Sequence, residues 1–189
     1  MTRALFIIDV QNDFTEGGAL GVEGGSAVAT GIAAMLTEHP QRYDVVFASR
    51  DWHDGDNDNG GHFSAAPDYV DSWPRHCVAG TSGADYHPGL AGVELDVEIR
   101  KGQGEPAYSI FDGTTDDGST AAAKLDELGI DEVDVVGIAT DYCVRASALG
   151  AIAAGRTTRV IAGLVAGVAA ESSAAALDEL AAAGVELVR

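Results

Sequence analysis

Short apolar runs alternate with stretches of helical character along most of this chain. Six runs are typical of buried strands, at residues 4–10, 44–49, 94–101, 133–137, 158–162 and 185–188. Four alanine-rich stretches between or after them favour helices, at residues 25–38, 120–128, 143–155 and 172–183. This alternation predicts an α/β fold of three layers, α/β/α, around a doubly wound, mainly parallel six-stranded sheet. Ligands of such sheets bind at the carboxyl ends of the strands, so polar residues at those ends are the first candidates for function.

A carboxylate and three histidines follow the second predicted strand. Asp51 and His53 lie just beyond its apolar part, and His62 and His76 come in the segment that follows. Alternate residues of an extended chain point the same way, so Asp51 and His53 should leave the sheet together. Imidazole and carboxylate ligands suit a divalent metal ion such as Zn²⁺, Fe²⁺ or Mn²⁺. The four residues together therefore indicate a mononuclear metal site, although any one of them alone would more often be an ordinary polar side chain.

The loop between these ligands has a plainer interpretation. Residues 54–61 are rich in glycine, aspartate and asparagine, a composition typical of turns. Loops of this composition are usually only turns.

Cys143 is the second candidate centre. It follows the predicted strand at 133–137 and opens a helical stretch, where free backbone amides and the positive end of the helix dipole stabilise a thiolate. Most unpaired cysteines are instead buried and act as small apolar residues. Cys77 fits that second description better than Cys143 does.

Two ionisable residues interrupt apolar strands. Asp9 lies near the end of the first predicted strand, where a charge is costly unless it is paired or functional. Lys101 ends the third predicted strand and is one of only two lysines in the chain. Asp9, Lys101 and Cys143 together would supply a general base, a cation and a nucleophile. Each residue alone would more often be part of a structural ion pair or of the core.

Several motifs carry a resemblance to a known family. They are IIDVQNDF at 7–14, SRDWH at 49–53, SWPRHCV at 72–78, RKG at 100–102 and VVGIATDYCV at 135–144. In this order they resemble the nicotinamidase/pyrazinamidase branch of the isochorismatase-like hydrolases, and the resemblance covers nearly the whole chain. It implies one domain, residues 1–189, with the isochorismatase-like hydrolase fold. It also implies hydrolysis of nicotinamide, and of pyrazinamide as well, through a cysteine thioester in NAD salvage.

The resemblance also implies roles for individual residues. The catalytic triad would be Asp9, Lys101 and Cys143. The ligands of one divalent metal ion would be Asp51, His53, His62 and His76. The aromatic residues around the pyridine ring would be Phe14, Trp73 and Tyr108, with Tyr142 at the rim, where some relatives carry histidine. The oxyanion hole would be formed by the amides of Ala139 and Cys143, with a cis peptide between Ile138 and Ala139.

Composition limits the partners. The 30 acidic residues against 11 basic ones give a formal charge of −19, which argues against a nucleic-acid partner because phosphate binding needs a basic face.

We find no signal peptide and no apolar stretch of the about 20 residues that a membrane span needs, so we expect a cytoplasmic protein that binds a small molecule, as a monomer or homo-oligomer. Two cysteines fit a reducing compartment. The charge indicates either general solubility or a halophilic host.

Two other functions remain open from the sequence. An isochorismatase-type hydrolase shares the fold but cleaves a vinyl ether, and it has no use for Cys143 or for a histidine-rich metal site. A non-catalytic metal-binding or interaction protein on the same scaffold is the other alternative.

Overall fold

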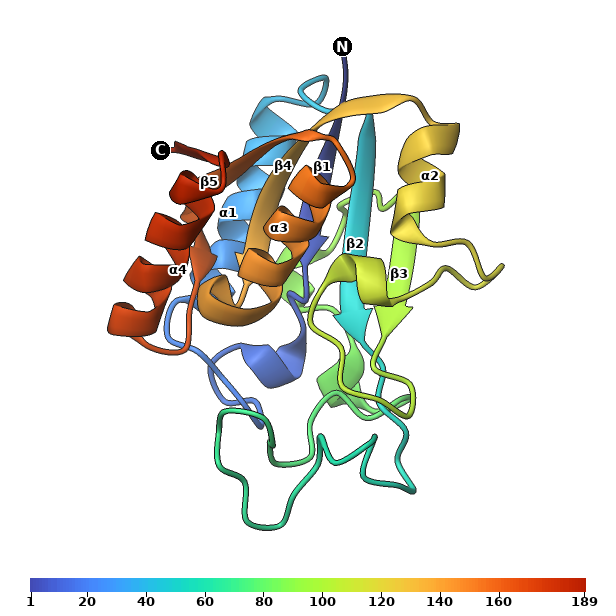
Figure 1. Ribbon diagram of the computed structural model, residues 1–189, viewed down its shortest axis with the longest axis vertical. Helices are drawn as coiled ribbons and strands as arrows, with labels where there is room; N and C mark the ends of the chain where they lie inside the picture. Colours follow the sequence, from blue (N-terminus) through green and yellow to red (C-terminus); the bar gives the residue numbers. More distant parts are fainter.

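The computed structural model describes residues 1–189 and contains one six-stranded sheet between two layers of helices (Figure 1). The strands are β1 (Thr2–Ile8), β2 (Val45–Asp51), β3 (Val97–Lys101), β4 (Ile130–Ile138), β5 (Thr157–Ala166) and β6 (Glu186–Val188). Their order in the sheet is β3-β2-β1-β4-β5-β6, and every neighbouring pair is parallel. The predicted doubly wound sheet is confirmed, and it is wholly rather than mainly parallel.

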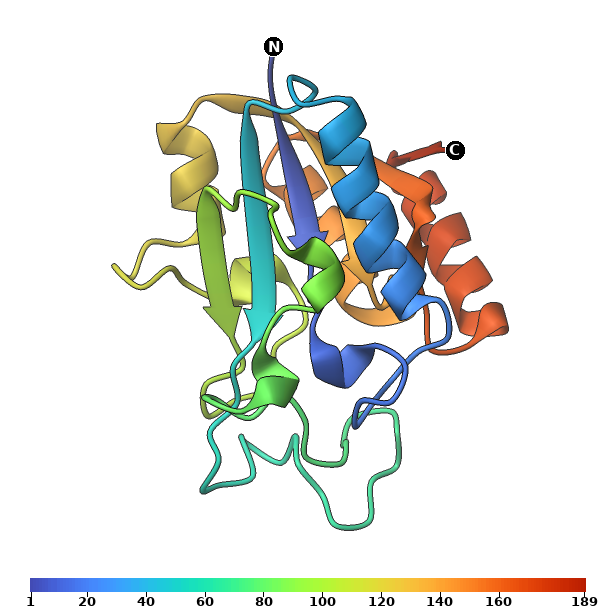
Figure 2. The same cartoon turned by 180° about the vertical axis from the view of Figure 1, so that it is seen from behind.

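Helices cover both faces of this sheet. Helix α1 (Gly25–Glu38) packs on one face and lies in front of it in Figure 2. The opposite face carries α2 (Ala121–Glu127), α3 (Arg145–Ala153) and α4 (Ala170–Ala182). All four predicted helices are therefore present. None of them combines the length and the apolar character that crossing a membrane requires.

Strand β1 shows why the sheet forms at the centre of the molecule. Its alternate side chains enter two separate cores, with Phe6 and Ile8 on the side of α3 and Leu5 and Ile7 on the side of α1. All four are fully buried. A strand covered on both faces needs an unbroken apolar run rather than alternation, which is the pattern that the sequence shows.

Several element boundaries differ from the sequence expectation: β3 begins at Val97 rather than at residue 94, and β4 begins at Ile130 rather than at residue 133. A π-helical turn, Thr140–Val144, precedes α3, so the helical segment begins three residues before Cys143. Strand β5 continues to Ala166 because its pairing with β4 shifts register between Val135 and Gly137. The Ala162–Gly163 pair interrupts the apolar run at this irregularity, which explains why the sequence predicts an earlier end.

The topology prepares a binding site between β1 and β4. The chain leaves these neighbouring strands toward opposite sides of the sheet, so a crevice opens beyond their carboxyl ends. The long connection from β2 to β3 covers this end of the sheet and lies at the bottom of Figure 1, drawn in teal and green. The candidate site residues lie between these strand ends and this connection.

Candidate active site

Lys101 is the centre of a buried charged cluster at the carboxyl ends of the strands. Its Nζ lies 2.9 Å from Oδ2 of Asp9 and 3.7 Å from Sγ of Cys143, and it forms an ion pair with Oδ1 of Asp51. Asp9 and Lys101 are fully buried, and Asp51 and Cys143 are nearly so. The structure thus brings together the three residues predicted as a triad and one predicted metal ligand.

The protonation of this cluster follows from burial and from its unequal charges. Burial raises the pKa of Asp9; the Lys101 ammonium opposes this rise and Asp51 adds to it. Burial acts in the same direction on Asp51, but the Lys101 ammonium, together with the nearby His53 and His76, outweighs it and holds the pKa of Asp51 well below the ordinary value. Two carboxylates thus share one ammonium, and of the two Asp9 is better suited to accept a proton, because its pKa is raised while that of Asp51 is lowered.

Cys143 differs from the expectation of a thiolate. Burial raises the pKa of its thiol well above the ordinary value; Lys101 opposes this effect, and Asp9 strengthens it. Loss of solvation and a nearby carboxylate outweigh the helix terminus, which is a weaker influence. The cluster therefore favours a protonated Cys143.

Ser49 fixes the carboxylate of Asp9. Its Oγ donates a hydrogen bond of 2.7 Å to Oδ1, and its carbonyl accepts one of 3.2 Å from the Asp9 amide. The other carboxylate oxygen, Oδ2, has no hydrogen-bond partner, although the Lys101 ammonium is close. One oxygen is thus held in place while the other remains free to accept a proton.

The turn that carries Cys143 exposes a backbone donor. The carbonyl of Ala139 accepts hydrogen bonds of 3.1 Å from the amides of Tyr142 and Val144, which closes the π-helical turn. The peptide between Ile138 and Ala139 is cis, as the resemblance implies. The Ala139 amide itself donates no hydrogen bond within the protein. It remains available for an oxygen atom in the adjacent cavity.

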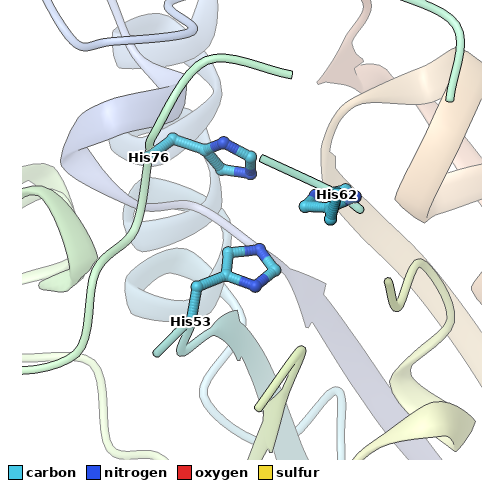
Figure 3. Close-up of side chains that lie close together, drawn as sticks. All are labelled: His53, His62 and His76. Carbon is cyan, nitrogen blue, oxygen red and sulfur yellow. The ribbon is translucent and has the colours of Figure 1, made fainter. Parts of the chain in front are cut away.

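Three histidines converge beside this cluster. The possible ligand atoms of His53, His62 and His76 all lie within 4.8 Å of one another, and Figure 3 shows the rings facing a common space. Oδ2 of Asp51 lies 3.6 Å from Nε2 of His53 and 3.8 Å from Nε2 of His76. Asp51 therefore contacts Lys101 with one oxygen and the histidine cluster with the other.

The chemistry of the histidines fits a metal ion. Nδ1 of His53 lies 2.7 Å from the carbonyl of Gly102, and Nδ1 of His76 lies 2.7 Å from that of Pro74. A carbonyl only accepts, so both Nδ1 atoms carry hydrogen, and in a neutral imidazole of this tautomer Nε2 has the lone pair that binds a metal ion. Nε2 of His53 and Nδ1 of His62 are buried without a partner, and burial, with His53 and His76 adding to it, lowers the pKa of His62 to about 4. Imidazoles with buried, unpaired nitrogen atoms beside a carboxylate suit a divalent ion.

Short pairings in the connection after β2 explain how distant histidines meet. One parallel bridge joins His53 to Val78 and places His76 next to His53. A second bridge joins Phe63 to Trp73, two residues that flank the site. The arrangement of the histidines thus depends on pairings within a segment that contains no long strand.

Two further residues support Asp51 and His53, and the sequence did not single them out. Gln11, fully buried, accepts from the Asp51 amide at 2.8 Å and donates to the Asp51 carbonyl at 2.9 Å and to that of Ala84 at 3.0 Å. Gly102 has φ of +81°, and a Cβ there would lie 2.4 Å from the His53 ring. The available signal was a polar residue directly after the first apolar run and a glycine directly after Lys101.

A cavity of about 460 Å³ opens onto both centres. Its wall includes Asp51, His62, His76, Ala139, Cys143 and the aromatic side chains Phe14, Trp73, Tyr108 and Tyr142. Trp73 Nε1 donates to the Tyr108 hydroxyl at 3.1 Å, and its ring meets that of Tyr142 edge-on with centroids 5.1 Å apart. The Tyr108 and Tyr142 rings are stacked, with centroids 6.1 Å apart. A pocket with aromatic walls and a polar floor suits a flat aromatic ligand with one polar substituent.

The sequence and fold of the chain were compared with those of known proteins. Residues 3–189 match the family described as the isochorismatase domain. The chain belongs to the isochorismatase family. The family assignment confirms the fold that the resemblance implied.

Several similar proteins in this family are named nicotinamidases or pyrazinamidases. The nicotinamidase/pyrazinamidase of Mycobacterium tuberculosis is 50% identical over 186 residues, which covers 98% of each chain. The pyrazinamidase of Pyrococcus horikoshii, solved in complex with zinc, superposes with a TM-score of 0.83 at 33% identity over 100% of this chain and 99% of its own. PnC1 from L. infantum, solved in complex with nicotinate, superposes with a TM-score of 0.85 at 35% identity. The match covers 100% of this chain and 92% of PnC1.

Proposed function

We propose that this chain is a metal-dependent nicotinamidase, which hydrolyses nicotinamide to nicotinate and ammonia, accepts pyrazinamide as well and acts in NAD salvage. The observation that carries the proposal is the shared position of Asp51, which joins the Asp9–Lys101–Cys143 cluster to the three histidines at the floor of one aromatic cavity. The identity of 50% with a nicotinamidase/pyrazinamidase over nearly the full length supports the same reaction.

The first half of the reaction forms the thioester. Oδ2 of Asp9 removes the thiol proton of Cys143, and Sγ attacks the carboxamide carbon of the substrate. The amides of Ala139 and Cys143 hold the oxyanion that forms. Asp9 then returns the proton to the amide nitrogen, the carbon–nitrogen bond breaks and ammonia leaves.

The second half of the reaction consumes water. Asp9 removes a proton from water, and the resulting hydroxide attacks the thioester carbon. The carbon–sulfur bond breaks, Cys143 regains its proton from Asp9, and the nicotinic acid that forms loses its proton to solvent to give nicotinate. Lys101, 2.9 Å from Asp9 and 3.7 Å from Cys143, stabilises negative charge on either group throughout.

One divalent ion, Zn²⁺, Fe²⁺ or Mn²⁺, would be held by Asp51, His53, His62 and His76. When bound, such an ion supplies a Lewis acid for a ring nitrogen or for water. The chain's own contribution is to orient the ring between Phe14, Trp73, Tyr108 and Tyr142 while the carboxamide faces Cys143. The zinc complex of the Pyrococcus horikoshii relative makes zinc the first ion to test.

The geometry is less suited to the two alternatives. Vinyl ether hydrolysis gives no role to Cys143, which here lies against a base and an ammonium at the cavity floor. A purely metal-binding protein gives no role to the aromatic walls.

The proposal is tested by incubating zinc-loaded protein with nicotinamide and measuring ammonia and nicotinate together. We expect both products in equal amounts, and a loss of turnover after the metal is removed with a chelator. A loaded protein that releases no ammonia from nicotinamide or pyrazinamide would contradict the proposal.

A further inference from the structure

One residue of the loop at 54–61 is not an ordinary turn residue. Asn59 is fully buried, with φ of +50°, although its neighbours on both sides are exposed. Its side-chain oxygen accepts hydrogen bonds from the amides of Asp54 at 2.9 Å and Gly104 at 3.1 Å. Its side-chain nitrogen donates to the carbonyl of Asp54 at 3.0 Å. Both the oxygen and the nitrogen of the carboxamide thus form hydrogen bonds, as a buried polar group requires.

These bonds join the segments that carry the histidines. Asp54 directly follows His53, and the Asn59 carbonyl accepts a hydrogen bond of 3.3 Å from the amide of His62. Gly104 lies two residues after Gly102, whose carbonyl contacts Nδ1 of His53. Asn59 therefore connects the segment that bears His53, the segment that bears His62 and the segment that orients the His53 ring.

We propose that Asn59 is a positioning residue of the metal site, which holds His53 and His62 at the spacing that a divalent ion requires. The inference rests on the metal site of the proposed function and assigns to Asn59 a role in the affinity of that site. Groups that orient metal ligands without contacting the ion typically change metal affinity about 10–100-fold when removed. The Asn59 carboxamide acts on the backbones of both ligand segments, so an effect in this range is expected.

A purely conformational role for Asn59 makes a different prediction. Asparagine tolerates positive φ better than most residues, so it could be required only for the shape of the turn. Glycine adopts this φ without cost but has no carboxamide. The variant Asn59→Gly therefore keeps the backbone conformation accessible and removes only the hydrogen bonds, whereas Asn59→Ala removes both.

The experiment compares Asn59→Gly and Asn59→Ala with Asp58→Ala, a control in the same loop whose side chain is exposed and makes no hydrogen bond. The dissociation constant for zinc is measured by competition with a chromophoric chelator, and thermal unfolding of the metal-free proteins is measured in parallel. We expect both Asn59 variants to bind zinc about 10–100-fold more weakly. The control should stay within about threefold of wild type, as exposed substitutions usually do.

Four results separate the possibilities. Wild-type zinc affinity in Asn59→Gly would overturn the proposal, and so would a lower unfolding midpoint of the metal-free variants with unchanged zinc affinity. A wild-type chain that binds no zinc would overturn both the metal site and the role of Asn59. A wild-type chain that binds zinc but releases no ammonia would contradict the nicotinamidase proposal alone. If Asn59→Ala does not fold, Asn59→Gly alone decides the outcome.

Discussion

At the scale of single residues, the site depends on carboxylates whose two oxygens have different partners. Oδ1 of Asp9 is held by Ser49, while Oδ2 remains free beside Lys101. Asp51 divides its oxygens between Lys101 and the histidines. The sequence predicted these charged residues because a charge at the end of an apolar strand is conspicuous. It could not predict Ser49 or Gln11, since each acts through a hydrogen bond to a residue 40 positions away.

Substitution of Ser49 tests how the base is oriented. We expect Ser49→Ala to lower kcat about tenfold, part of the about 10²–10⁴-fold contribution of a general base, with little change in KM. Ser49→Thr keeps the hydroxyl and should restore most of kcat. Steady-state kinetics with nicotinamide gives kcat and KM for both variants. Equal activity of the alanine variant and wild type would rule out the orienting role.

The pH dependence of activity follows from Asp9. A protonated Asp9 cannot accept the thiol proton, so kcat/KM should fall as the pH drops through the pKa of Asp9. Burial raises that pKa, with Lys101 opposing, so the fall should occur above the ordinary carboxyl value of about 3.9. The Ser49 hydrogen bond lowers the pKa of Asp9, so Ser49→Ala should move the acidic limb to still higher pH. An acidic limb at or below the ordinary value would contradict this description.

At the scale of elements, three parallel strands bring the proposed triad residues together at their carboxyl ends. The alternation of apolar runs and helical stretches was enough to predict this arrangement, because a covered parallel sheet needs those runs. The loop after β2 was not predictable in the same way. Its histidines come together through isolated bridges such as that of His53 with Val78. Its composition is typical of an exposed turn and gave no indication that Asn59 would be buried.

Two glycines after β3 provide a matched test of how this edge orients His53. Gly102 and Gly104 both have positive φ, +81° and +77°, so an alanine should cost about 1–2 kcal/mol of stability at either position. Only at Gly102 would the new Cβ meet the His53 ring, at 2.4 Å; at Gly104 the nearest atom is 3.5 Å away. We expect both variants to unfold at lower temperature and only Gly102→Ala to lose zinc, measured by elemental analysis. Equal zinc content in the two variants would argue against this role of Gly102.

At the scale of the whole molecule, acidic residues far outnumber basic ones. Seven of the nine arginines form ion pairs, yet the formal charge of −19 leaves many of the 30 carboxyl groups without a cationic partner. Repulsion among such groups destabilises a folded chain, and salt screens it. The proposed halophilic host and a merely dispersed charge therefore differ in their response to salt.

Thermal unfolding in chloride salts separates these two possibilities. If the charge reflects a halophilic surface, the unfolding midpoint should rise between about 0.1 M and about 3 M sodium chloride, because the screening length falls from about 10 Å to below about 3 Å. Potassium chloride should give the same rise, whereas sulfate would strengthen apolar burial in any protein and is unsuitable. A flat or falling midpoint in both chlorides would remove the halophilic interpretation and leave the proposed activity untouched.

The most direct test of the central claim is the turnover number of Cys143→Ala on nicotinamide, with Cys77→Ala as the matched control. Both thiols are buried, but only that of Cys143 lies beside Lys101 at the cavity floor. We expect Cys143→Ala to lose at least about 10³-fold in kcat while it keeps its zinc and its fold, since removal of a nucleophile leaves only residual catalysis. Cys77→Ala should keep most of its activity. Substantial ammonia release by zinc-loaded Cys143→Ala would show that the thiol is not the nucleophile and would contradict the mechanism.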